Sequence, residues 1–141
     1  MLANKKTMTS IHRDRVKNEM VDAGLSETGF YRLDATYLPQ IIKPTEHIKG
    51  LTYGHNKIEP IMLVCTNMRV ICLRKEPYFI DQDDISFSII SGVSYSKVGQ
   101  GSTIVLHTNF SDYTVRTYNQ TSARNFVESI ETVCLTFTNA K

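Results

Sequence analysis

The side chains that most often carry out catalysis or bind metal ions are few and scattered in this sequence of 141 residues. The four histidines and three cysteines are His12, His47, His55, His107, Cys65, Cys72 and Cys134. They form no Cys-x-x-Cys or His-x-x-x-His pair, which are spacings typical of zinc sites. A cysteine nucleophile would gain a histidine base only if tertiary folding brought the two together. We therefore predict no metal site and no catalytic site.

Two other short motifs contain residue types that bind ions or phosphate, but neither has the neighbours that such a site needs. Asp81, Asp83 and Asp84 cluster in IDQDDIS without the glycine and further oxygen ligands of a calcium loop, so we predict a solvated turn. The Gly99-Gln100-Gly101 segment precedes no helix N-terminus, so we predict a hairpin turn and no phosphate-binding loop. We expect no cofactor and no enzymatic activity.

Positive charge is concentrated near the N-terminus. The chain has 16 Lys and Arg against 14 Asp and Glu, a net charge of +2. The cations of residues 1–17 are Lys5, Lys6, Arg13, Arg15 and Lys17, and the single acidic residue of that stretch is Asp14. Residues 46–141 hold nine basic and nine acidic side chains, which cancel, so the overall charge does not favour binding to nucleic acid.

Hydropathy and cysteine content indicate the compartment. No run of about 18 apolar residues is present, so no membrane-spanning helix is predicted. The first residues are charged and precede no apolar segment, which argues against a secretory signal. Three cysteines are an odd and sparse set, typical of a reducing compartment. We predict a cytoplasmic protein with one domain and a short appendage.

The hydrophobic periodicity changes from helical to extended near Glu46. Before that point we predict a helix over residues 10–23, capped by Ser10 and ended by Gly24, and a short helix over residues 35–42, capped by Asp34 and shortened by Pro39. After it, strands are predicted over residues 47–55, 58–66, 69–75, 78–81, 85–97, 103–110 and 113–118. The last element is an amphipathic helix with Thr121 or Ser122 as its cap, and its apolar residues are Ala123, Phe126, Val127, Ile130, Val133, Cys134 and Phe137.

The segment LVCTNMRVICL (residues 63–73) predicts a hairpin that is apolar on both faces. A two-residue turn at Asn67-Met68 pairs Cys65 with Val70. One face then holds Leu63, Cys65, Val70 and Cys72, and the other holds Met62, Val64, Ile71 and Leu73. The second face needs a cover, either the N-terminal helix, the helix near Tyr37 or another subunit. The two hairpin cysteines lie diagonally at ~7–8 Å, which suits small core residues and not a disulfide.

Three segments resemble motifs of the bacterial pleckstrin-homology-like (PH-like) domain family. They are LPQIIKPTEHI (residues 38–48), TNMRVI (residues 66–71) and the stretch from Asp84-Ile85 to Val93, followed by a glycine-rich turn and another strand. The resemblance covers roughly residues 36–135. It implies a mostly β (α+β) fold, a curved seven-stranded antiparallel barrel with the last helix as a plug. We therefore expect an N-terminal helical arm, residues 1–33, and a PH-like domain, residues 34–141.

The resemblance also implies a docking role, in which bacterial members assemble into oligomers. Eukaryotic relatives that bind phosphoinositides have a cluster of basic residues in the first hairpin. Here Lys57, with Lys49 and His55 near it, is the only cation of that loop, and no paired Lys/Arg motif is present.

Two hypotheses for function follow. The first is a non-catalytic interaction module that makes protein–protein contacts, including homo-oligomers. Its expected interface comprises Met62, Val64, Ile71 and Leu73, with Arg13, Arg15 and Lys17 of the arm. The alternative is peripheral binding to an anionic lipid surface through the basic arm and through Lys49, His55 and Lys57.

Overall fold

The computed structural model describes residues 2–26 and 37–139 and shows a single curved antiparallel sheet with helices packed on it. The strands are β1 (Ile48–Asn56), β2 (Glu59–Thr66), β3 (Val70–Lys75), β4 (Ile80–Ile85), β5 (Ile90–Val98), β6 (Gly101–Thr108) and β7 (Asp112–Thr117). Their order is β4-β3-β2-β1-β7-β6-β5, so the pairing of β1 with β7 joins the two halves of the sheet. The predicted curved sheet of seven antiparallel strands is confirmed.

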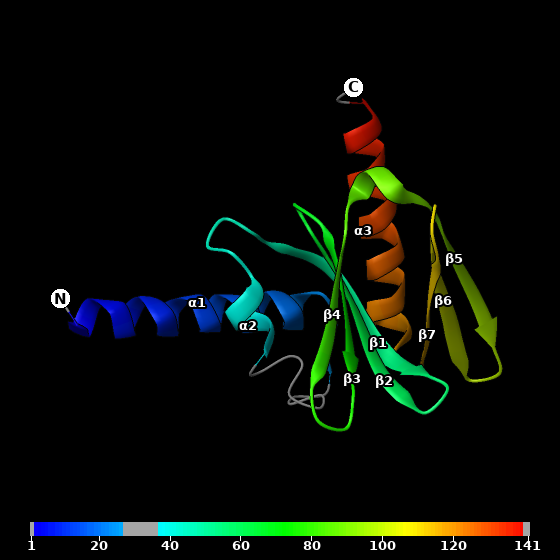
Figure 1. The fold of residues 1–141 in the computed structure, drawn as a ribbon. Helices are drawn as coiled ribbons and strands as arrows, with labels where there is room; N and C mark the ends of the chain where they lie inside the picture. The colour runs from blue at the N-terminus through cyan, green and yellow to red at the C-terminus, as the bar shows by residue number, and fades with distance from the viewer. Residues whose placement is uncertain (1, 27–36, 140–141) are drawn as a thin grey trace.

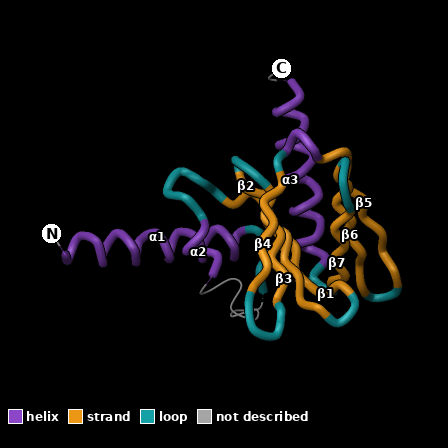
Figure 2. The backbone as a smooth tube through the Cα atoms, viewed as in Figure 1, coloured by secondary structure: helices purple, strands orange, loops and turns teal. Residues whose placement is uncertain are grey.

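Three α-helices accompany the sheet. They are α1 (Leu2–Asp22), α2 (Leu38–Ile41) and α3 (Gln120–Asn139). The last helix lies between the two halves of the sheet, whereas α1 projects away from it beside α2 (Figures 1 and 2). This arrangement confirms the predicted plug and the predicted helical extension.

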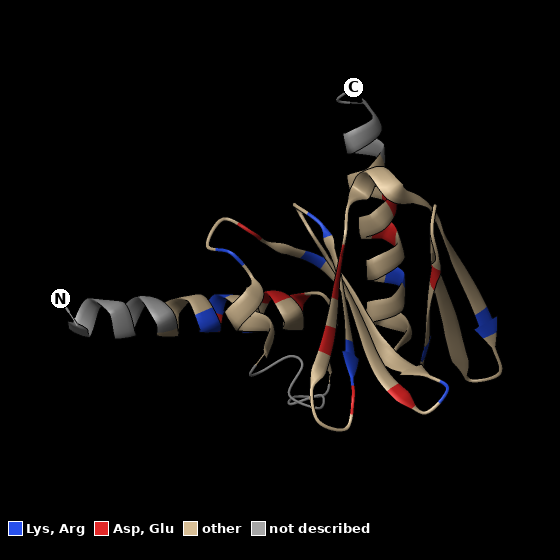
Figure 3. Cartoon of the chain, in the orientation of Figure 1, with Lys and Arg blue, Asp and Glu red and all other residues tan. Residues whose placement is uncertain are grey.

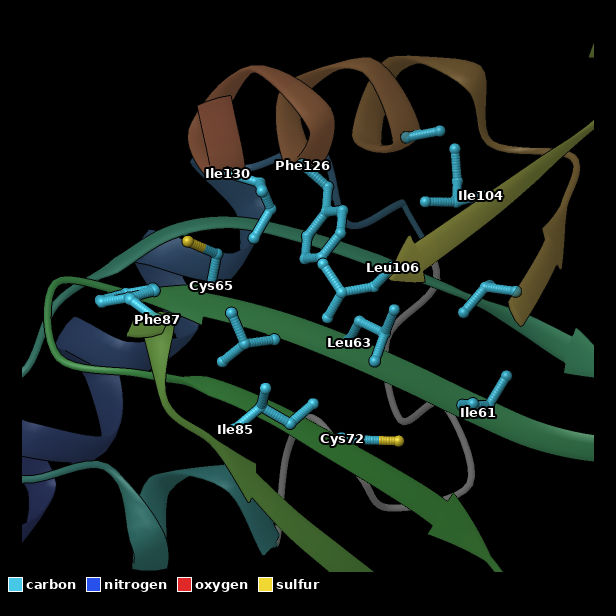
Figure 4. Packing of buried hydrophobic residues seen from close by; sticks show 13 residues of the cluster. Ile61, Leu63, Cys65, Cys72, Ile85, Phe87, Ile104, Leu106, Phe126 and Ile130 are labelled. Atoms are coloured by element: carbon cyan, nitrogen blue, oxygen red, sulfur yellow. The ribbon is translucent and has the colours of Figure 1, made fainter. Parts of the chain in front are cut away.

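The hairpin of β2 and β3 separates two hydrophobic cores. The observed register pairs Cys65 with Val70 and Leu63 with Cys72, as predicted. One face of the hairpin belongs to the barrel core, together with Phe126 and Ile130 of α3 (Figure 4). The other face belongs to a second core, whose buried residues include Val16, Met20, Leu38, Ile42, Met62, Val64, Ile71 and Leu73. The chain's own helices α1 and α2 therefore cover the second face.

Helix α1 differs from the prediction at its start but not at its terminating residue. Helix α1 begins at Leu2 and not near Ser10, it ends at Asp22, and Gly24 terminates it as predicted. The Gly24 N–H donates to the carbonyl of Val21 and the Leu25 N–H to that of Met20, at 2.9 and 3.0 Å, which is the pattern of a Schellman motif. Gly24 has a φ of 107°, which a residue with a Cβ rarely adopts.

The short helix and the last helix are each fixed by one local residue. Pro39 sits in the first turn of α2, which is one turn long, as the proline suggested. Asn119, and not Thr121 or Ser122, caps α3, because its Oδ1 accepts from the Ser122 N–H at 3.0 Å. The expected Asp34 cap and the expected boundary between residues 33 and 34 lie outside the described residues.

The strand predicted over residues 78–81 is β4 and runs further, to Ile85, and the strand predicted over residues 85–97 begins only at Ile90. Strand β4 ends at Ile85, and a 3-10 turn (η3, Phe87–Ile89) leads into β5. The Ser86 side chain caps this turn by accepting from the Ser88 N–H at 3.3 Å. Because Ile85, Phe87 and Ile89 all still pack on the barrel core, the alternating pattern continues through the break and conceals it.

The acidic cluster lies in strand β4 and not in the predicted solvated turn. The Arg74 guanidinium bridges two of its members, at 2.6 Å from Asp81 and 3.0 Å from Asp83. The third, Asp84, lies 2.8 Å from Arg69. Ion pairs with Arg74 of β3 and with Arg69, the residue before β3, therefore account for these carboxylates.

The three motifs that resemble the family meet at Arg69. Its guanidinium donates to both carboxylate oxygens of Glu46 at 2.9 Å, and it contacts Asp84 as well. Glu46 is fully buried and also accepts from the Thr66 hydroxyl at 2.7 Å. Asn67 adds a bond from the His47 N–H at 2.7 Å. The motifs thus join the segment before β1 to the turn between β2 and β3 by hydrogen bonds and an ion pair.

Strand β1 passes very close to β7 at Gly54. A Cβ at this position would lie 1.9 Å from the carbonyl oxygen of Arg116, which belongs to the backbone and cannot swing away. We expect Gly54→Ala to lower the free energy of unfolding by at least the ~1–3 kcal/mol typical of overpacking, measured by urea denaturation. Gly92→Ala is the matched control, since a Cβ there meets nothing within 4 Å. Equal stability of the two variants would contradict the close approach.

Candidate docking surface

The residues of the expected protein interface lie in two different environments. Met62, Val64, Ile71 and Leu73 are fully buried beneath α1 and α2. A protein partner could reach them only after these helices had moved, so an interface at this face stays a prediction. On the arm, Arg13 and Lys17 are exposed.

Arg15 is engaged within the fold. Its guanidinium lies 2.8 Å from the Glu19 carboxylate and donates to the carbonyl oxygens of Glu46 and Lys43 at 3.0 and 3.2 Å. Glu19 in turn accepts from the Ile48 N–H at 2.8 Å and contacts His47. Burial alone would raise the pKa of Glu19, but these hydrogen bonds outweigh burial and lower it. Arg15 therefore anchors α1 to the segment that precedes β1.

The three residues of the expected lipid contact do not form one group. Lys49 lies near the start of β1, whereas His55 lies near its end and Lys57 in the following turn. Six residues of extended chain separate Lys49 from His55 by ~20 Å. Lys49 lines a separate groove between the end of α1 and α3, of about 440 Å³. The structure thus places His55 and Lys57 together and Lys49 elsewhere.

His55 and Lys57 belong to one end of the barrel, where three hairpin turns converge. We call this end the hairpin rim: residues 56–59 between β1 and β2, 76–79 between β3 and β4, 98–101 between β5 and β6, and 118–120 between β7 and α3. The pairs His55–Arg116, Ser102–Thr117 and Val98–Gly101 bring the ends of β1, β7 and β5 to this side. The three turns lie together at the lower end of the molecule in Figure 1.

Each segment of the hairpin rim exposes at least one large apolar side chain. Ile58 and Tyr78 are 95% and 97% exposed. Phe79, Val98 and Tyr118 are also exposed. Single exposed apolar residues are ordinary, but their gathering at one end of a fold is typical of an interaction surface. Sequence reasoning missed this set because its members are far apart in the chain, and only the folded topology assembles them.

Two adjoining clefts open at the rim, next to the first turn of α3. The smaller is about 430 Å³ and is lined in part by Asn119 and Gln120. The larger, about 670 Å³, includes Lys57. Both are lined by His55, Arg116, Thr117 and Tyr118. Cationic side chains, hydroxyl groups and a helix N-terminus give these clefts the chemistry that receives an anion.

Cations outnumber carboxylates at the hairpin rim. The cations within two residues of its segments are Lys57, Arg74, Lys75, Lys97 and Arg116, and the acidic residues are Glu59, Glu76 and Asp81 (Figure 3). Burial of Glu59, together with the neighbouring Glu76, raises the pKa of Glu59.

Thiol and metal chemistry receive little support from the described side chains. Burial raises the pKa of the Cys65 and Cys72 thiols to about 12 in each case, so neither forms a thiolate near neutral pH. In residues 10–26 and 37–134, His, Cys, Asp and Glu side chains form no group that could hold a metal ion. Within the described helices, none is long and apolar enough to span a bilayer.

Comparison with known proteins identifies the family. Residues 42–132 match the family model described as "Bacterial PH domain". The fold is similar to the crystal structure of a DUF1696 family protein with a pleckstrin-homology domain from Shewanella loihica PV-4, with a TM-score of 0.51 and 15% sequence identity. That similarity covers 77% of this chain and 99% of the other. A search of curated proteins found no match. Because the family model matches well over half of the residues, this chain belongs to the bacterial PH domain family.

Proposed function

We propose that this chain is a docking module that binds peripherally to an anionic membrane through the hairpin rim. The observation that carries the proposal is the gathering of exposed apolar side chains and cations at one end of the barrel. PH domains generally mediate contacts with proteins or lipids, which is consistent with either kind of partner.

The arrangement of the rim suits a bilayer surface. Its apolar side chains stand on separate turns, so each can enter the interface between headgroups without a matching pocket on the partner. Each partly buried apolar side chain contributes through ~25 cal/mol per Å² removed from water. Each nearby cation adds about 1 kcal/mol on an anionic surface. The clefts beside Lys57 and Arg116 can take headgroup phosphate between these contacts.

The proposal keeps the expected cytoplasmic location, because the cytoplasmic leaflet carries the anionic lipids that attract cations. It differs from the alternative drawn from the sequence in one respect. The hairpin rim replaces Lys49 and the basic arm as the binding surface, since Arg15 is engaged in the fold and Lys49 is remote.

Co-sedimentation with phosphatidylserine-containing vesicles tests the proposal. We expect the wild-type chain to bind these vesicles at low salt, to bind less at physiological salt and to ignore vesicles of phosphatidylcholine alone. The double variant Lys57→Glu with Arg116→Glu should weaken binding at least about tenfold, because it removes two favourable charges of about 1 kcal/mol each and adds two unfavourable ones.

The matched control reverses two exposed charges on the arm, Arg13→Glu with Lys17→Glu. This variant should lose much less affinity than the rim variant, although it has the same net charge. Loss of binding in the arm variant with retention in the rim variant would move the site to the arm. No binding of the wild-type chain to anionic vesicles would reject the lipid proposal and leave a protein partner as the candidate.

A further inference from the structure

A serine, a histidine and an aspartate are joined by hydrogen bonds on the second half of the sheet. The Ser94 hydroxyl lies 2.7 Å from Nε2 of His107, and Nδ1 of His107 lies 3.1 Å from Oδ1 of Asp112. The aspartate fixes the tautomer, because a proton on Nδ1 can be donated to its carboxylate. Nε2 is then an acceptor for the serine hydroxyl. These are the contacts that activate a serine nucleophile.

The strands hold the three side chains on the outer face of the sheet. Val93 and Tyr95 point toward the barrel core, so Ser94 between them points outward. Leu106 is buried, and the next residue, His107, faces outward and is paired with Asp112 across β6 and β7. The side chains of His107 and Asp112 are 38% and 56% exposed, which leaves the group open to a small reactant.

We propose that Ser94 is a nucleophile that accepts the acyl group of activated aryl esters of short carboxylic acids. Its Oγ attacks the carbonyl carbon while Nε2 of His107 takes the hydroxyl proton. The carbon–oxygen bond to the phenol then breaks, and His107 returns the proton to the leaving oxygen. Water next attacks the acyl-serine with His107 as the base, which releases the carboxylic acid and restores Ser94. Asp112 is a positioning residue that acts through His107.

The edge position of β5 supplies a donor for the developing oxyanion. The two-residue turn at Gly99 and Gln100 makes Val98–Gly101 a hydrogen-bonded pair, and alternation along the ladder makes Ser94–Val105 another. The N–H of Tyr95 therefore points away from β6, and β5 is a terminal strand of the described sheet. This N–H directly follows the nucleophile, which is one position used for oxyanion stabilisation in serine hydrolases.

The inference does not depend on membrane binding, because it concerns the outer face of the sheet and not the hairpin rim. The open site has neither the enclosure nor the multiple oxyanion donors of a developed hydrolase, so it favours esters with good leaving groups. A slow second step would let the acyl-serine accumulate.

Acetylation by p-nitrophenyl acetate tests the inference on the full chain. We expect a burst of p-nitrophenolate that approaches one equivalent per chain, and an acetyl group on the peptide containing Ser94 by mass spectrometry. Ser94→Ala and His107→Gln should each lower the burst rate at least about tenfold. Asp112→Asn should do the same and should remove the downfield proton resonance of the His107 imidazole.

Ser96→Ala is the matched control. Ser96 lies on the same face of the same edge strand, followed by another outward N–H, and it has no histidine hydrogen-bonded to it among the described contacts. The burst should persist in this variant. A burst that survives Ser94→Ala, or acetyl groups found on lysines or Ser96 but not on Ser94, would overturn the assignment. Urea denaturation of each variant separates loss of the nucleophile from loss of the fold.

Discussion

Glu46→Ala is expected to lower the free energy of unfolding by about 3–5 kcal/mol, because it removes one partner of a buried ion pair and leaves the other charge behind. The Arg69 guanidinium would lose both of its 2.9 Å bonds to the carboxylate, and the Thr66 hydroxyl would lose its acceptor. Urea denaturation followed by circular dichroism measures the loss. Glu128→Ala is the control, because Glu128 is an exposed glutamate on α3 whose replacement should change stability by less than about 0.5 kcal/mol.

The pH dependence of this loss identifies its cause. Burial alone would raise the pKa of Glu46, but hydrogen bonds from Arg69, Thr66 and the Lys43 N–H outweigh burial and lower it below 4.5. A carboxyl whose pKa is lowered by folding contributes stability that is present above its unfolded value and disappears as the pH falls through its folded value. The difference between wild type and Glu46→Ala should therefore narrow below pH 4.5. A difference that stays constant down to acidic pH would contradict the ion pair as its source.

Phe126→Ala is the second large effect that we expect, again about 3–5 kcal/mol of unfolding free energy. Phe126 is fully buried and points from α3 into the barrel core near Leu106 and Cys65 (Figure 4). Its removal would leave a cavity where the helix contacts both halves of the sheet. The measurement is thermal or urea unfolding with wild type as the reference.

Phe110→Ala is the matched control for Phe126, because it removes the same side chain from an 82% exposed position in the turn after β6. Its effect should stay within about 0.5 kcal/mol. If both variants lost the same stability, α3 would not be the plug of the barrel.

The local sequence pattern was sufficient to predict the hairpin of β2 and β3, but not the end of β4 before Ser86. A two-residue turn fixes which side chains share a face, so the two apolar faces of β2 and β3 followed from residues 63–73 alone. The passage from β4 to β5 keeps the alternation of inward side chains while the backbone leaves one half of the sheet for the other. No local signal in the chain distinguishes such a turn from a continuous strand.

The surfaces were harder to predict than the core, because they depend on contacts between distant segments. Ile58, Tyr78 and Val98 come to the same end of the barrel only through the strand order, and the Glu46–Arg69 pair joins residues 23 positions apart. Ser94 and His107 lay within predicted strands, but their pairing required the register of β5 with β6. Asp112 lay between two predicted strands, and in the structure it begins β7. The alternation along each strand therefore predicts which face of the sheet a side chain lies on, whereas the register between strands decides which side chains are neighbours.

Helices α1 and α2 cover one face of the β2–β3 hairpin, and this affects where the chain can be shortened. A fragment cut at the limits of the family match, residues 42–132, would omit Val16, Met20 and Leu38 while keeping the apolar wall that they shield. The fragment would then expose Met62, Val64, Ile71 and Leu73 to solvent. We expect it to aggregate and to bind other proteins non-specifically, for reasons unrelated to its natural partner. Oligomers or non-specific binding of such a fragment would result from the loss of α1 and α2. The same behaviour of the full chain would instead indicate a property of its natural surface.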